Sequence, residues 1–124
     1  MSMQIVPYYT LPHDSRSGIT LAFRLPLTEK TLRERFEMPL RDGSTKYLEN
    51  LAPIGRELVE EIAKVDGIFC IHVQRHDCEV IHSKSYRWNG DVGPKVLQAV
   101  KVALEKHGYE AKRRRRRKSK KQMK

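Results

Sequence analysis

The end of the chain sets the first limit on what this sequence can fold into. Residues 112–124 contain ten of the 25 lysines and arginines and none of the 15 aspartates and glutamates. Like charges at this density repel one another, and the segment offers almost no apolar surface whose burial could offset the entropy cost of ordering. We therefore expect a folded domain over residues 1–111 and a disordered polybasic tail over residues 112–124. The predicted domain keeps 15 basic and 15 acidic side chains and is neutral, so the tail carries the net charge of +10.

The predicted domain is long enough for one hydrophobic core. No apolar run approaches the roughly 20 residues that a membrane-spanning helix needs, and Met1–Pro7 lacks the basic and apolar segments of a secretory signal. Cys70 and Cys78 are the two cysteines of the chain, too few for a disulfide framework, and a reducing compartment would keep both as thiols. We expect a protein of the cytoplasm that has no membrane partner.

The first forty residues are typical of three β-strands. Met3–Tyr9 and Gly18–Leu25 are rich in β-branched and aromatic residues, and the linker between them is rich in turn-forming residues. Thr31–Leu40 alternates apolar and charged side chains, which predicts a third strand, although Leu32 and Phe36 also fit one face of a helix.

Two amphipathic helices and a hairpin follow. Apolar residues recur at spacings of three and four over Leu51–Val65, which predicts a helix. Ile68–Val73 and Cys78–His82 then form two short strands around a four-residue loop. A second helix is expected to begin at a cap residue, Asp91, and to end at Gly108. Local connections of this kind predict an α+β fold with a mostly antiparallel sheet and both helices packed on one face.

Several of these segments together resemble a known family. They are the helix end Leu58–Ile68, the hairpin strand Cys78–Ile81, Trp88, the helix start Gly93–Leu97 and the strand Gly18–Phe23. In this combination the chain resembles, over residues 3–105, the N-terminal domain of NifU-like (Nfu family) iron–sulfur scaffold proteins. The cluster-binding CxxC motif of that family belongs to a second domain, and this sequence has no CxxC. The resemblance therefore implies a fold, together with a role as an accessory protein of iron–sulfur cluster assembly that docks a cluster-carrying partner.

The hairpin also concentrates residue types that zinc prefers as ligands. The candidates are Cys70, His72, His76, Cys78 and His82. The loop fixes the expected register, with three facing pairs: Val73 and Cys78, Ile71 and Val80, and Phe69 and His82. Because strand side chains alternate between the two faces, Cys70 and His72 would lie on the face opposite Cys78 and His82, and a one-residue slip would reverse this. We expect no metal, with the cysteines packed as small apolar residues.

Nothing in the sequence indicates an enzyme. A Cys70–His72 dyad would lack the orienting partner that activates a nucleophile. Gly90–Pro94 contains two glycines but not the lysine and hydroxyl residue that complete a phosphate-binding P-loop. Trp88 could stack on a nucleic-acid base, but a lone tryptophan before a helix more often anchors a core.

The polybasic tail gives the strongest indication of function. Arginine forks match phosphate oxygens in bidentate geometry. Phosphate binding also releases counterions, so the logarithm of the affinity for duplex DNA falls with the logarithm of the salt concentration, with a slope of about 0.9 for each contact. We expect a non-enzymatic nucleic-acid-binding or ribonucleoprotein-associated adaptor without a cofactor, in which the tail binds RNA or DNA and the folded domain contacts a protein partner. A solubilising tail and a nuclear-import signal remain open. The predicted binding residues are Lys112, Arg113, Arg114, Arg115, Arg116, Arg117, Lys118, Lys120 and Lys121.

Overall fold

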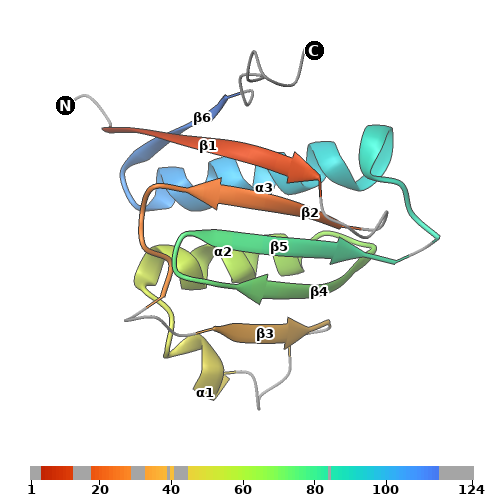
Figure 1. The fold of residues 1–124 in the computed structure, drawn as a ribbon, viewed down its shortest axis with the longest axis horizontal. Helices are drawn as coiled ribbons and strands as arrows, with labels where there is room; N and C mark the ends of the chain where they lie inside the picture. Colours follow the sequence, from red (N-terminus) through yellow and green to blue (C-terminus); the bar gives the residue numbers. More distant parts are fainter. Residues whose placement is uncertain are drawn as a thin grey trace, which may run out of the picture.

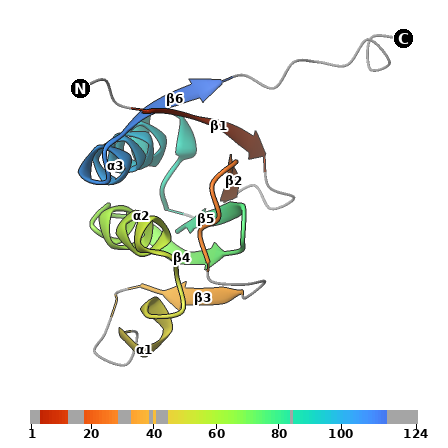
Figure 2. The same ribbon diagram turned by 90° about the vertical axis from the view of Figure 1, so that its left-hand side faces the viewer.

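The computed structural model describes residues 4–12, 18–28, 33–38, 40, 45–83 and 85–114 of the 124-residue chain. A six-stranded sheet lies against two helices, α2 (Pro53–Ala63) and α3 (Gly93–Lys106), which cover the same face of the sheet (Figures 1 and 2). The predicted α+β class is confirmed. In chain order, the other elements are β1 (Gln4–Pro12), β2 (Gly18–Phe23), β3 (Glu34–Glu37), the short helix α1 (Thr45–Leu48), β4 (Ile68–Val73), β5 (Asp77–His82), the π-helical turn η2 (Trp88–Val92) and β6 (Tyr109–Arg114).

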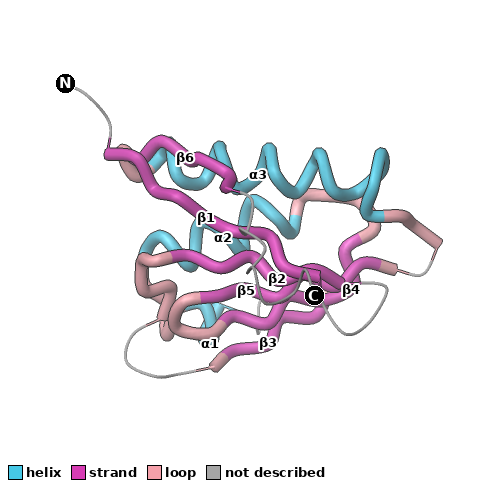
Figure 3. The backbone as a smooth tube through the Cα atoms, turned by 45° about the horizontal axis from the view of Figure 1, so that its top comes forward, coloured by secondary structure: helices cyan, strands magenta, loops and turns pink. Residues whose placement is uncertain are grey.

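The sheet has the strand order β3-β4-β5-β2-β1-β6 and is mixed. Four of its five strand pairs are antiparallel, in agreement with the mostly antiparallel sheet expected from short connections. The fifth pair, β1 with β6, is parallel, because α3 carries the chain back along the sheet before β6 begins. Figure 3 shows the two strands side by side along α3. The strand order therefore places the first and last strands of the described chain next to each other at one edge of the sheet.

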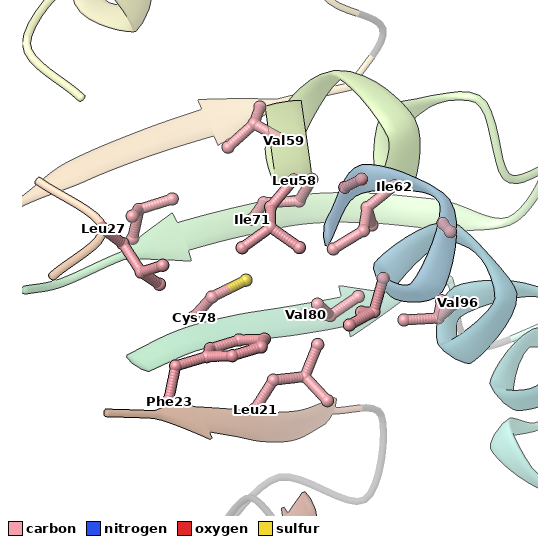
Figure 4. Packing of buried hydrophobic residues seen from close by; sticks show 14 of the residues in the cluster. Leu21, Phe23, Leu27, Leu58, Val59, Ile62, Ile71, Cys78, Val80 and Val96 are labelled. Carbon is pink, nitrogen blue, oxygen red and sulfur yellow. The ribbon is translucent and has the colours of Figure 1, made fainter. Parts of the chain in front are cut away.

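The core lies between the sheet and the two helices. Every second residue of β2 is buried, and β5 alternates in the same way, so each strand turns one row of side chains toward the helices. Leu58 and Ile62 of α2 and Val96 of α3 close this layer from the other side (Figure 4). Burying an aliphatic side chain of this size contributes roughly 1.5–3 kcal/mol. The apolar residues whose spacing of three and four predicted the helices thus lie on the buried faces of those helices.

Two glycines allow close contacts around α2. Pro53 fixes the start of the helix, and a Cβ atom at Gly55 would lie only 2.0 Å from the carbonyl oxygen of Leu27. The helix ends before Gly67, whose φ of +94° is left-handed and whose Cα lies under the ring of Tyr86. Both positions exclude a larger residue, so α2 is held close to its neighbours at each end.

The strands near the N-terminus differ in length from the prediction. β1 extends to Pro12, and among the described residues of the predicted Thr31–Leu40 the third strand covers Glu34–Glu37. The alternation of apolar and charged residues there is a strand pattern, as expected, and Phe36 is its buried residue. Asp91 was expected to cap the second helix. Its carboxylate instead accepts a hydrogen bond from the backbone N–H of Arg87 at 3.2 Å, inside the π-helical turn.

One predicted pair of the β4–β5 hairpin is wrong. Val73 faces Cys78 and Ile71 faces Val80 as expected, but His82 faces Ile68 instead of Phe69. A bulge between Ile68 and Cys70 shifts the register by one residue, and the side chain of Phe69 is 55% exposed. The bulge keeps Ile68 in the core, which a regular ladder would have turned outward.

The folded part of the chain also extends further than predicted. β6 includes Lys112, Arg113 and Arg114, which we had assigned to the disordered tail. These three residues pair with β1, whose backbone supplies the hydrogen-bonding partners that a free arm would lack. The structure therefore moves the start of any free tail from residue 112 to residue 115 or later. The rest of the predicted tail lies outside the described residues.

Candidate nucleic-acid interface

The three described residues of the predicted binding segment lie on β6, at the edge of the sheet. Lys112 faces Pro7, Arg113 faces Tyr8 and Arg114 faces Tyr9 in the parallel register with β1. All three basic side chains are exposed. A charged edge strand is a common device by which proteins prevent the pairing of sheet edges with other chains, so this placement alone is compatible with a purely protective role.

The alternation of strand side chains divides these three residues between two faces. Arg113 lies on the side of Tyr8, which is buried toward the helices. Lys112 and Arg114 lie on the open face, by which we mean the face of the sheet turned away from α2 and α3 (Figure 2). A polyanion that runs along this edge can therefore be contacted from both sides of β6.

Arg113 is held in place by the neighbouring strand. Its Nε and Nη2 atoms donate to the hydroxyl oxygen of Thr10 at 3.3 Å and 3.0 Å. Burial raises the pKa of Tyr8, and the nearby guanidinium of Arg113 partly opposes this by lowering it. Tyr8 also stacks on Phe23, with ring centroids 5.5 Å apart. An arginine has five N–H donors, so its contacts with Thr10 leave three that can bind phosphate from a fixed position.

On the open face, β1 places apolar and aromatic side chains beside the charged side chains of β6. Tyr9 is half-buried and lies next to Arg114, while Ile5 is 49% exposed and lies next to Glu110. An aromatic ring beside a guanidinium is an arrangement that single-stranded nucleic acids use for stacking and phosphate contact. The sequence analysis missed Tyr9 as a possible contact because only the pairing of β1 with β6 brings it beside the basic residues.

The other predicted binding residues cannot be placed. Arg115, Arg116, Arg117, Lys118, Lys120 and Lys121 lie outside the described residues. What the structure does fix is the position of the residue that precedes them, because Arg114 is the last described residue of β6.

The five Cys and His candidates for a metal site do not converge. Cys78 and His82 are buried on the helix side of β5, whereas Cys70 and His72 lie on the open face of β4, as the hairpin register predicted. His76 lies in the loop, exposed, with Nδ1 3.3 Å from the carbonyl oxygen of Leu25. Within the part of the chain that the structure describes, no three metal-ligating side chains lie together.

The two cysteines are protected thiols. Burial, together with the neighbouring carboxylates of Asp77 and Glu79, raises the pKa of Cys78 to about 12. Burial also raises the pKa of Cys70, although Arg35 beside it acts in the opposite direction. The thiolate is the nucleophilic and metal-binding form of cysteine, so neither residue is activated for such chemistry in the folded protein.

Trp88 behaves as an anchor of the core. It is half-buried in η2 and packs against the core cluster. The first residue of α3, Gly93, lies so close that a Cβ atom there would be 2.4 Å from the carbonyl oxygen of Trp88 and 3.0 Å from its indole nitrogen. This packing favours the structural interpretation of Trp88 over base stacking.

An ion-pair network joins the two helices and was not predicted. Glu61 of α2 is 9% exposed and accepts hydrogen bonds from Lys64 at 2.8 Å and from Lys106 of α3 at 3.0 Å. These two bonds lower the pKa of Glu61. Glu57 lies 3.6 Å from both Lys106 and His107. Only the Glu61–Lys64 spacing is visible in the sequence, because the other contacts depend on how α2 and α3 pack.

Comparisons with known proteins give little further guidance. No family model matches the chain, and no curated protein matches it. Among solved structures, it is similar to protein SAV1430 from Staphylococcus aureus, with a TM-score of 0.48 and 14% identity over 83% of this chain and 98% of that one. The resemblance to NifU-like proteins thus stays a prediction. The described helices include none that is both long and apolar enough to cross a membrane.

Proposed function

We propose that this protein is a non-enzymatic nucleic-acid-binding adaptor that binds phosphates through the basic segment beginning at Lys112. The observation that carries the proposal is the position of Lys112, Arg113 and Arg114 on an exposed edge strand. They begin a run of ten positive charges in a chain whose first 111 residues are neutral. A rigid base at the sheet edge gives the following basic residues a defined starting point on the protein surface.

The chemistry of this segment favours nucleic acid over other polyanions. Five consecutive arginines, residues 113–117, supply planar forks that bind phosphate oxygens in bidentate geometry. Anionic lipid surfaces attract basic clusters too, but stable membrane attachment usually needs an apolar or acylated anchor beside them. Binding through phosphates alone is largely indifferent to base sequence. We therefore propose RNA or DNA as the partner, in the cytoplasm.

The proposal is tested with a chain that ends at Arg114. This truncation removes seven positive charges and leaves β6 complete, whereas removal of residues 112–124 would also delete half of that strand. A second variant, in which the seven basic residues after Arg114 are replaced by Gln, separates the effect of charge from that of length. Binding to RNA, duplex DNA and anionic vesicles is measured by fluorescence anisotropy at low salt.

We expect both variants to lose most of the affinity for RNA and DNA while the circular dichroism spectrum of the fold is unchanged. Equal binding of nucleic acid by the full chain and by both variants would refute the proposal. Strong binding to vesicles with weak binding to RNA and DNA would point to a membrane surface instead.

The alternative function, an accessory role in iron–sulfur cluster assembly, rests on the family resemblance alone. Cys70 and Cys78 lie on opposite faces of the sheet, so they cannot bind the same ion. That geometry does not bear on whether the folded domain docks a cluster-carrying partner, and no contact among the described residues favours such docking.

A further inference from the structure

On the open face of the sheet, β1 presents a row of apolar side chains. The helices α2 and α3 pack on the other face (Figure 2), where Val6 and Tyr8 of β1 are buried. Because side chains alternate along a strand, Ile5, Pro7 and Tyr9 lie on the open face. Ile5 is 49% exposed, and the other two are half-buried. The row therefore offers apolar surface, including part of one aromatic ring, to a partner.

Two basic side chains of β6 stand beside this row. Parallel pairing sets Lys112 next to Pro7 and Arg114 next to Tyr9. Both basic side chains are exposed, and they lie on the same face of β6, two residues or about 6.6 Å apart. Neighbouring apolar and basic rows match the two parts of a nucleotide chain, because the bases present flat faces for stacking and the phosphates carry the charge.

Acidic residues limit the path that a polyanion can take over the open face. Glu110, near the start of β6, is exposed on this face and repels phosphate there. Asp77 and Glu79 of β5 lie on the same face, two strands or about 10 Å from β1. The favourable path therefore follows the β6 edge from Lys112 to Arg114, beyond which the sequence continues with further basic residues.

Stacking on the row needs bases whose flat faces are free. In a duplex, each base is covered by the bases above and below it, whereas an unpaired strand can turn a base onto an aromatic side chain. Tyr9 is the aromatic residue of the row, and the guanidinium of Arg114 beside it can bind a phosphate of the same strand. This pairing of a ring with a cation suits an unpaired strand.

We propose that the open face at β1 and β6 binds single-stranded nucleic acid, with one base stacked on Tyr9 and phosphates bound by Lys112 and Arg114. This inference rests on the proposed function and adds to it. Phosphate contacts act on paired and unpaired strands alike, whereas stacking acts on unpaired bases and tolerates any sequence, because every base has a π face. The site thus adds affinity for single strands without selecting a base sequence.

The test compares single-stranded and duplex forms of one strand with the full-length chain. Fluorescence anisotropy is recorded for labelled oligodeoxyuridylate, alone and paired with oligodeoxyadenylate. Tyr9→Ala should weaken binding of the single strand by at least about fivefold, or about 1 kcal/mol at 1.4 kcal/mol per tenfold change. The same variant should change duplex binding by less than about twofold, because the base faces are covered there. The loss for the single strand should persist at higher salt, since stacking releases no counterions.

Matched variants separate stacking from folding. Tyr9→Phe keeps the ring and should bind the single strand within about twofold of wild type. Tyr47→Ala removes a tyrosine ring that is 51% exposed on α1, near the sheet edge opposite β6 (Figure 1), and should leave binding unchanged. If Tyr9→Ala alters the circular dichroism spectrum, photo-crosslinking of the wild-type chain to a single strand that carries 5-iodouracil decides. We expect mass spectrometry to find the crosslink at Tyr9, and crosslinks confined to other residues would contradict the proposal.

The outcomes distinguish this inference from the proposed function. If the full chain binds neither form, the proposed function fails and the stacking site with it. If the full chain binds both forms and Tyr9→Ala weakens them equally or not at all, the stacking site is overturned while phosphate binding stands. Oligouridylate, which differs from oligodeoxyuridylate by its 2′-hydroxyls, is titrated in parallel, and the tighter of the two strands identifies the partner as RNA or DNA.

Discussion

Glu61 gives the sharpest prediction about stability, because it holds the two helices together through charges that the structure resolves. Its carboxylate, 9% exposed, accepts hydrogen bonds from Lys64 of its own helix and from Lys106 of α3. Replacing it by Gln keeps the shape of the side chain and removes the charge. The two lysine side chains are 67% and 49% exposed, so solvent screens both interactions. At about 0.5–1 kcal/mol for each screened pair, Glu61→Gln should lower the free energy of unfolding by about 1–2 kcal/mol.

The pH dependence of this loss follows from the direction of the pKa shift. Hydrogen bonds from the two lysines lower the pKa of Glu61 in the folded protein, whereas the pKa of a glutamate in an unfolded chain is about 4.3. A lowered folded-state pKa gives stability that is fully present above the unfolded pKa and is lost as pH falls through the folded pKa. The difference between wild type and Glu61→Gln should therefore be constant near neutral pH and shrink below about pH 4.

Urea unfolding followed by circular dichroism measures both quantities. Glu60→Gln is the matched control, because Glu60 is the adjacent, half-buried residue of the same helix. We expect it to change the free energy of unfolding by less than about 0.5 kcal/mol, as is usual for surface substitutions. The reasoning is refuted if the two variants are equally stable at neutral pH, or if the loss in Glu61→Gln persists undiminished in acid.

Two further predictions concern the core. Gly55→Ala should destabilise the fold by about 1–3 kcal/mol in urea unfolding, because its Cβ would meet the backbone carbonyl of Leu27; a stability equal to wild type would show that α2 can move away from Leu27. Cys78 should resist alkylation by iodoacetamide near neutral pH until the protein unfolds, because it is buried and its pKa is raised to about 12. Alkylation of Cys78 in the native state, detected by mass spectrometry, would contradict this.

The sequence predicted the elements whose patterns are local. The helix periodicity marked the buried faces of α2 and α3, and the loop length set the facing pair Val73 and Cys78. These predictions succeeded because the spacing of apolar residues and the length of a short loop already determine which side chains face the core.

The parts that failed depend on distant contacts. β6 alternates Tyr109, Glu110, Ala111 and Lys112 after Gly108, a strand pattern that the adjoining basic run concealed. Charge repulsion favours a free arm only while the segment has no partner, and β1 provides one. The bulge at Phe69 likewise follows from the requirement to bury its neighbour Ile68.

The candidate site was predictable only in part. The basic composition of residues 112–124 is evident from the sequence alone. The place of Arg113 beside Thr10 and of Arg114 beside Tyr9 requires the parallel pairing of the first and last strands. Sequence patterns report which face of its own strand a residue occupies, but not its neighbours on another strand.

The salt dependence of duplex DNA binding tests the central claim most directly. The slope of log affinity against log salt counts the phosphates that the protein neutralises, at about 0.9 per contact. If all ten basic residues of the segment engage phosphate, the full chain should give a slope near −9, and the chain ending at Arg114, which keeps three of them, a slope near −3. A slope that stays the same after truncation would place the phosphate contacts elsewhere on the molecule and contradict the account.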